Sequence, residues 1–410
     1  MAEPEVALVV LRRTLRYAER RFSLGARLDG IRDPRQRRRI PWPVAMRSIM
    51  MVALTRLGSI NAIEDPRRAS VRYGWVGASL PSADRIGDCA DMVDAQRMRD
   101  IIHAVYTQLK RGKMIEPLHG FLPLVVDGHE VCASYHRHCR ACLRRTVNGR
   151  TQYYHRVVAA QLVTRRFCLT LDIEVVQRGE DEVAAAMRLL DRLYRVYPRA
   201  WDIVLGDSLY ARADFFAFVR RHRDHVLTVA KDDRRELLKE AACRCRRTKP
   251  MVITRGTRTC EVWDIADCQG WPDETTAIRL IKSVERRRVR RQRTKKTEEV
   301  ASTWAWASTC PASVAPLLDL FDTGHGRWCI ENQGFNALAN EWHFDHVFKH
   351  KPDAMVVFML FILLAYIVFE AFYSCNLHPA LRSRLCRLTV ARAILAAFYD
   401  WLPGRAARSP

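Results

Sequence analysis

The sequence feature that most constrains the fold is a run of sixteen residues without a charge, 354–369, which ends at Glu370. As a helix, at about 1.5 Å per residue, this run spans about 24 Å, less than the roughly 30 Å hydrocarbon core of a bilayer. Such a run folds either as a helix buried in a protein core or as a membrane anchor. No other segment resembles a membrane span, and Lys349, His350 and Lys351 stand directly before the run. We therefore predict a core helix and no membrane partner.

The charge of the chain is the second constraint. Among 410 residues, 68 are Lys or Arg and 45 are Asp or Glu, so the formal net charge is +23. A surface this basic attracts polyanions, of which nucleic acid is the commonest. The hydrophobic content of 49% excludes wholesale disorder, and the length indicates two or three units packed together. We therefore expect a folded protein that binds nucleic acid.

The cysteines and the first residues bear on the compartment. There are thirteen cysteines, an odd number, and the start of the chain, MAEPEV, lacks the basic and apolar segments of a secretory signal. Both observations favour a chain whose thiols stay reduced and act mainly as small buried side chains. We expect a cytoplasmic protein, associated with the nucleoid if it binds DNA.

Hydrophobic patterning divides the chain into segments. Residues 1–116 have the pattern of basic helices and are a candidate DNA-binding region. In 117–233 the order is three strands, a helix, a strand, a helix and a strand, which predicts an α/β fold with a mixed sheet. Short β-type runs follow in 234–310, where we expect a β-rich insertion with a small sheet of its own. The segment 311–402 is again helical, and 403–410 form a tail.

The densest basic run is 286–296 (RRRVRRQRTKK), in which eight of eleven residues are basic. It is either a mobile, solvated turn or a hairpin that contacts phosphates, and the net charge of the chain favours the hairpin. Its candidate DNA-binding residues are Arg286, Arg287, Arg288, Arg290 and Arg291. Arginines also recur with helical spacing at positions 12, 13, 16, 20 and 21, where they form either a phosphate-binding or a solvated helix face.

Three acidic residues are candidates for one site. Asp127 and Asp207 each follow an apolar strand at the point where the strand ends. A single aspartate there is commonly a turn former, but on adjacent parallel strands two carboxylates converge at one edge of the sheet. Because such carboxylates repel unless a cation lies between them, the pair indicates a metal. Glu331 is the third candidate; Arg327, four residues before it, shares its helix face, and the alternative is an ordinary ion pair along that helix.

The runs that hold these residues resemble a known family. VVDG (125–128), VLGDSLY (204–210) and RWCIEN (327–332) are similar to the three acidic motifs of DDE transposases from bacterial insertion sequences. More narrowly, they resemble the IS-four-like group, in which a β-rich insertion interrupts an RNase H-like core before the glutamate. The separations of 80 residues (207 − 127) and 124 residues (331 − 207) fit, and the second is long enough to hold the insertion.

The resemblance implies a transposase that cleaves DNA strands and transfers them at the ends of an insertion sequence. It implies an RNase H-like fold in which Asp127, Asp207 and Glu331 are both the catalytic residues and the ligands of two Mg²⁺ ions, which Mn²⁺ can replace. Arg327 would contact DNA. The implied partners are double-stranded DNA, at the transposon ends and at the target, and a second copy of the chain in a homodimer on the DNA ends.

The sequence departs from the family at two positions. The glutamate helix of the family often carries a tyrosine and a lysine that grip the phosphates of DNA ends, and these positions hold Gly324 and Leu338. The alternative function is therefore a catalytically inactive DNA-binding protein derived from a transposase. The three intact carboxylates favour the enzyme.

A group of cysteines and histidines lies between the first two core strands. It contains His129, Cys132, Cys139 and Cys142, with two further histidines at 136 and 138. A tetrahedral Zn²⁺ needs four such ligands, and Cys-x-x-Cys supplies two thiolates on one tight turn. The other two come from His129 and Cys132, or from one of the histidines at 136 and 138. The segment is either a structural zinc site, with Cys132, Cys139, Cys142 and His129 as its ligands, or a flexible basic loop.

Overall fold

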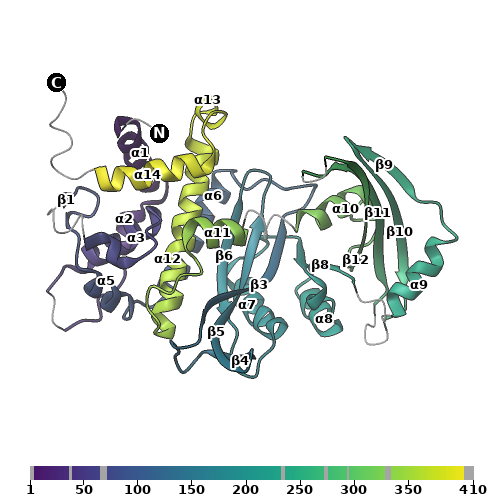
Figure 1. The fold of residues 1–410 in the computed structure, drawn as a ribbon, viewed down its shortest axis with the longest axis horizontal. Coiled ribbons are helices and arrows are strands. Elements are labelled where there is room, and N and C mark those ends of the chain that lie inside the picture. Colours follow the sequence, from purple (N-terminus) through teal and green to yellow (C-terminus); the bar gives the residue numbers. More distant parts are fainter. Residues whose placement is uncertain are drawn as a thin grey trace.

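The computed structural model describes residues 4–36, 39–64, 72–231, 236–271, 276–292, 295–327 and 334–400. A helical N-terminal region, a central α/β region and a β-rich region follow one another across the molecule (Figure 1). One long helix, α12 (Pro352–Ala371), lies between the N-terminal helices and the sheet.

The N-terminal region is helical, as its sequence predicts. Pro43 lies in the first turn of α3, where its missing N–H leaves no hydrogen bond unmade. Asp94 begins α6, and its carboxylate accepts a hydrogen bond from the backbone N–H of Gln96. The elements of this region are α1 (Pro4–Phe22), α2 (Leu24–Asp29), α3 (Trp42–Leu54), the 3₁₀ turn η1 (Ile60–Ile63), the strands β1 (Arg72–Tyr73) and β2 (Ala78–Ser79), α5 (Ala83–Ala90) and α6 (Ala95–Arg111).

The centre of the molecule is a ten-stranded sheet, in which nine strands follow the order β4-β5-β3-β7-β8-β12-β11-β10-β9 and the tenth, β6, pairs with β5. β4 and β6 pair with successive parts of the same edge of β5. Its strands are β3 (Pro123–Ser134), β4 (Leu143–Val147), β5 (Arg150–Val163), β6 (Cys168–Val175), β7 (Ile203–Gly206), β8 (His225–Val229), β9 (Met251–Arg255), β10 (Arg258–Cys268), β11 (Ile278–Arg290) and β12 (Thr297–Ser308).

Parallel and antiparallel pairing meet at β3. β5 runs antiparallel to β3, whereas β7 pairs in parallel with β3, and β8 in parallel with β7. Parallel neighbours need a crossover connection, and α7 (Glu182–Val196) and α8 (Ala213–Arg221) supply it. The predicted order of elements in 117–233 is therefore confirmed, with β4 as an additional strand that the pattern did not reveal.

The β-rich segment does not form a sheet of its own, so that prediction was wrong. β12 pairs antiparallel with β8, from Trp306 opposite Val229 to Ser308 opposite Leu227. The strands β9 to β12 therefore extend the core sheet, and α9 (Glu236–Cys245) packs on β10. The physical reason is that the free edge of β8 offers unpaired N–H and C=O groups, and a neighbouring strand satisfies them.

α12 contains the apolar run and is buried, as predicted for a core helix. By length and composition it could cross a membrane, but 94% of its most apolar 18-residue window is buried inside the fold. It packs against α3, α6 and β6. Near its end, Glu370 is 4% exposed, and its carboxylate accepts hydrogen bonds of 3.0 and 2.9 Å from Nε of Arg387.

The chain after the sheet is helical, as predicted. α14 packs against α1, so the two ends of the described chain meet (Figure 1). The tail predicted at 403–410 lies outside the described residues. The helical elements are α10 (Leu317–Gly326), α11 (Asn336–Trp342), α12, the π-helical turn η4 (Phe372–Asn376), α13 (Pro379–Arg382) and α14 (Arg387–Asp400).

Candidate active site

Asp207 directly follows the last residue of β7, whereas Asp127 lies within β3, which continues to Ser134, so the prediction that the first strand ends at Asp127 was wrong. The strands pair in parallel, with Val125 opposite Leu205. If this register is continued by two residues, Asp127 lies opposite Asp207, and Asp207 is the residue that directly follows β7. The structure therefore brings the two aspartates together on adjacent strands, as the sequence predicts.

Asp127 is mostly buried. Its Oδ1 accepts a 2.9 Å hydrogen bond from the backbone N–H of Gly128, and its Oδ2 lies 3.5 Å from the guanidinium of Arg327. Burial raises the pKa of Asp127 to about 7; the charge of Arg327 opposes this rise, and the negative charges of Asp207 and Glu182 add to it. When Asp127 is ionised, Arg327 offsets only part of the negative charge of the three carboxylates, and a bound cation would offset more of it.

Asp207 is held in place by a tight turn. It precedes the 3₁₀ turn η2 (Ser208–Tyr210), and its Oδ1 accepts a 2.8 Å hydrogen bond from the backbone N–H of Leu209. Aspartate is among the preferred residues at such a cap, because its short side chain reaches the free N–H groups. The same turn places Tyr210 in the interior, where its hydroxyl donates a 3.0 Å hydrogen bond to Glu182.

Glu182 is a third carboxylate of this site, and the sequence did not single it out. It lies in the first turn of α7, its side chain is 9% exposed, and it is 3.4 Å from the guanidinium of Arg156. Burial raises its pKa, and the charge of Asp207 adds to the rise. It packs so closely on Gly128 that a Cβ there would clash with it. In the sequence it belongs to three consecutive acidic residues before an amphipathic helix, a pattern typical of any helix N-terminus.

Glu331 lies outside the described residues, in the segment 328–333. Residues on both sides of that segment contact β3. Arg327 pairs with Asp127, and the ring of Phe335 stacks on the ring of His129 with centroids 4.8 Å apart. The side chain of Arg327 is only 11% exposed, so this predicted DNA-binding residue lies beside the carboxylates and not on the open surface.

Comparison with known proteins identifies the family. A sequence profile described as "Transposase DDE domain" matches residues 124–368, more than half of the chain. The chain belongs to this family. The transposase predicted from the three acidic motifs is confirmed at this level, and membership implies DNA binding and the use of divalent metal ions, typically Mg²⁺. A search of curated proteins found no match to this transposase.

The two departures from the family pattern have structural reasons. Gly324 lies on α10 against Trp306, and a Cβ at 324 would be 2.9 Å from Nε1 of the indole. Because Trp306 is itself 3% exposed, a tyrosine at this position could not fit without displacing it. Leu338 on α11 is 1% exposed and belongs to the core, where an unpaired lysine would be unfavourable.

The described part of the basic run belongs to the hairpin of β11 and β12, and its contact with phosphates stays a prediction. Its five candidate arginines, at 286–288, 290 and 291, are all at least partly exposed. Arg286 and Arg291 form ion pairs of 3.1 and 2.9 Å with nearby glutamates. Arg287 and Arg288 form no ion pair with any residue in the described part of the chain, so they are the better candidates for phosphate contact.

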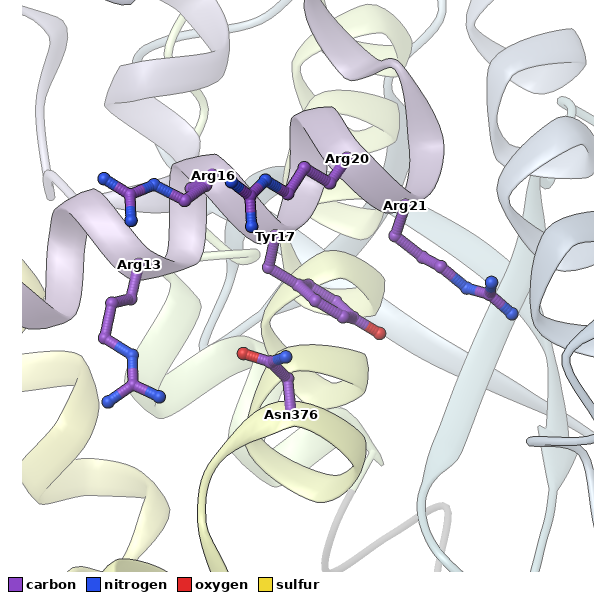
Figure 2. A pocket seen from close by; sticks show the side chains of 6 residues that line it. All are labelled: Arg13, Arg16, Tyr17, Arg20, Arg21 and Asn376. Atoms are coloured by element: carbon purple, nitrogen blue, oxygen red, sulfur yellow. The ribbon is translucent and has the colours of Figure 1, made fainter.

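A second basic feature lies on α1, where arginines surround a surface hollow of about 380 Å³ (Figure 2). Arg21 donates a hydrogen bond of 3.2 Å to the backbone carbonyl of Gln108, whereas Arg13, Arg16 and Arg20 are exposed. A cluster of guanidinium groups around a hollow is a candidate contact for backbone phosphates. The residues that line it are Arg13, Arg16, Tyr17, Arg20, Arg21 and Asn376.

Two of the four predicted zinc ligands, His129 and Cys132, are not among the described side chains whose ligand atoms meet around Cys139 and Cys142. His129 stacks on Phe335, and its Nε2 lies 2.5 Å from Oδ1 of Asp345. Cys132 falls where β3 shifts its register against β5, and its φ of 53° turns the backbone away from regular strand geometry. Cys139 and Cys142, in contrast, lie together.

Proposed function

We propose that this transposase cleaves DNA strands and transfers them at the ends of an insertion sequence, and that it belongs to the IS-four-like group. The observation that carries the proposal is the pair Asp127 and Asp207, on adjacent parallel strands in a chain of the DDE family. Neighbouring carboxylates repel one another, and the guanidinium of Arg327 compensates only part of the negative charge around Asp127. A cation-dependent reaction accounts for the presence of these carboxylates.

Asp127, Asp207 and Glu331 would hold two Mg²⁺ ions. Carboxylate oxygens are the hard ligands that Mg²⁺ prefers, and the negative charges of Asp207 and Glu182 act on Asp127 in the same region. Bound there, the ions would activate a water or a DNA 3′-hydroxyl for attack and stabilise the leaving oxygen. Glu182 adds to the negative potential at Asp127 and so favours cation binding.

Arg327 would orient the phosphate that is attacked. Its guanidinium lies 3.5 Å from Asp127, and the planar guanidinium can bind two phosphate oxygens at once. Because its side chain is 11% exposed, it would reach the phosphate from within the site. Four residues of chain extend at most about 14 Å, so Glu331 is close enough in the sequence to Arg327 to join the aspartates.

The strand order supports an RNase H-like interpretation of the core. β6, β5 and β3 form an antiparallel meander, and β7 and β8 follow in parallel on the other side of β3. In this interpretation, the insertion begins after β8, and the chain returns to the core at α10. The strands β9 to β12 are then the insertion of the IS-four-like group, attached to the edge of the core sheet.

The DNA would run along the exposed arginines. Arg287 and Arg288 on β11 are free of ion pairs with described residues, and the hollow on α1 offers further guanidinium groups. Each phosphate that such a residue neutralises releases counterions, which makes binding depend on salt. α1 and β11, which carry the two basic features, lie toward opposite ends of the molecule (Figure 1). We infer that they bind different parts of the DNA.

The test is cleavage, in the presence of Mg²⁺, of a supercoiled plasmid that carries the DNA flanking the coding region. We expect Asp127→Asn, Asp207→Asn and Glu331→Gln each to abolish cleavage and to keep DNA binding. Asp202→Asn is the matched control, because Asp202 lies at the opposite end of β7. Its carboxylate accepts a 2.9 Å hydrogen bond from the backbone N–H of Leu122, and an amide oxygen can replace it.

Two results would contradict the proposal. If Asp207→Asn cleaves at nearly the wild-type rate, the assignment of the carboxylates is wrong. If the wild-type protein binds the flanking DNA but does not cut it with Mg²⁺ or Mn²⁺, the chain is the inactive DNA-binding protein instead.

A further inference from the structure

Four side chains that commonly bind metals meet outside the candidate active site. Cys139 and Cys142 lie in the loop between β3 and β4, His155 lies on β5, and His350 lies shortly before α12. One sulfur or ring nitrogen from each lies within 4.8 Å of all the others. His155 and His350 are 13 and 208 residues from Cys142, so only the fold brings the four together.

The distances match a tetrahedral zinc site. With Zn–S of about 2.3 Å and Zn–N of about 2.0–2.1 Å, tetrahedral angles place two sulfurs about 3.8 Å apart and a sulfur and a nitrogen about 3.6 Å apart. The sulfurs of Cys139 and Cys142 are 3.7 Å apart. Nε2 of His155 lies 3.4 and 3.3 Å from these two sulfurs. Nε2 of His350 lies 3.5 Å from the sulfur of Cys142.

The surroundings suit metal ligands. His155 is 1% exposed, so its imidazole is held in place by the core around it. Its Nε2 faces the sulfurs of Cys139 and Cys142, whereas its Nδ1 is buried without a hydrogen-bond partner among the described residues. The backbone N–H of Cys139 donates a 3.2 Å hydrogen bond to the sulfur of Cys142, which fixes the position of that sulfur.

We propose that Cys139, Cys142, His155 and His350 bind one structural zinc ion. Four protein ligands leave no open coordination position, so the ion would not take part in the reaction. The ligands also separate this site from the carboxylates, because sulfur and imidazole nitrogen select Zn²⁺ and carboxylate oxygens select Mg²⁺.

The ion would cross-link two distant parts of the family-matched region. Cys139 and Cys142 follow the strand that carries Asp127, and His350 lies near the end of the connection between α11 and α12. The same connection contains Asp345, which contacts His129 on β3. The zinc would therefore hold the segment that leads into the core helix α12 against the end of β3.

The first experiment measures the metal content of the protein, purified without chelators from cells grown with added zinc. We expect about one zinc per chain in the wild type and background levels in Cys142→Ser and His350→Ala. Cys132→Ser is the matched control and should keep its zinc, since Cys132 lies outside the group. Asp127→Asn should also keep its zinc, which separates this site from the carboxylates.

A second measurement uses the wild-type protein alone, in case the variants do not fold. Cobalt added to the zinc-free protein should give the visible absorption of tetrahedral Co²⁺ with sulfur-to-metal charge transfer. Wild-type protein without stoichiometric zinc and without this spectrum would overturn the proposal. So would loss of zinc in Cys132→Ser with retention in His350→Ala, or a disulfide between Cys139 and Cys142 in the purified protein.

Discussion

Replacing Asp127 with asparagine should stabilise the metal-free protein, although it removes a residue of the candidate active site. Burial and the charges of Asp207 and Glu182 raise the pKa of Asp127 from 3.8 to about 7. The folded state therefore prefers the protonated carboxyl, and ionisation works against folding. The asparagine side chain cannot ionise, and its amide oxygen can still accept the hydrogen bond from the N–H of Gly128.

The magnitude follows from the difference between the two pKa values. A rise of about three units at about 1.4 kcal/mol per unit gives at most about 4 kcal/mol. Because 22% of the side chain is exposed and water screens part of the repulsion, we expect about 2–3 kcal/mol. The contribution of Asp127 to wild-type stability is fully present below about pH 4. It falls as the pH rises toward about 7, the pKa of the folded state, and is constant above it.

The assay is urea unfolding in EDTA, followed by tryptophan fluorescence at pH 5, 6, 7 and 8. The stability of Asp127→Asn relative to the wild type should grow by about 2 kcal/mol between pH 5 and pH 8. Saturating Mg²⁺ should reduce this gap, because the cation binds the wild-type carboxylate and compensates its charge. Asp202→Asn reports the general effect of removing one negative charge from a chain of net charge +23. A wild type that is more stable than Asp127→Asn at pH 8 without metal would refute the reasoning.

Three further predictions concern other parts of the chain. Glu182→Gln should raise the Mg²⁺ concentration needed for half-maximal cleavage several-fold, and should have a smaller effect on the maximal rate of cleavage. Equal Mg²⁺ dependence in variant and wild type would contradict the place of Glu182 in the site. The double variant Arg287→Gln, Arg288→Gln should bind DNA more weakly. Its plot of log binding constant against log salt concentration, measured by fluorescence anisotropy, should be less steep by about 0.9 for each phosphate that is no longer neutralised; an unchanged slope would mean that these arginines are only solvated side chains. Arg387→Ala should lower the free energy of unfolding in urea by about 3 kcal/mol, because it leaves Glu370 buried without its partner. Adding Glu370→Gln should recover part of this loss, and a loss below about 1 kcal/mol would contradict the pairing.

Local pattern in the sequence was sufficient for the elements around the aspartates. Apolar runs predicted the strands, and the helices between them implied that β3, β7 and β8 run in the same direction. With these strands parallel, Asp127 and Asp207 were expected to lie close together, and the pairing of β3 with β7 places them on adjacent strands. The apolar run of α12 similarly predicted a buried helix, because a run of sixteen residues without a charge is more stable when it is removed from water.

The tertiary structure alone decided which distant segments meet. In the sequence, Glu182 indicates only the start of a helix. The packing of α7 against β3 is what places it beside Gly128 and the aspartates. Cys139 and Cys142 were recognisable as a ligand pair, but His155 and His350 join them through the folding of β5 and of the connection before α12. The pairing of β12 with β8 was equally invisible. Strands and helices follow from the local periodicity of side chains, whereas pairing at a sheet edge is made by backbone N–H and C=O groups, which are the same for nearly every residue and therefore leave no pattern in the sequence of either partner.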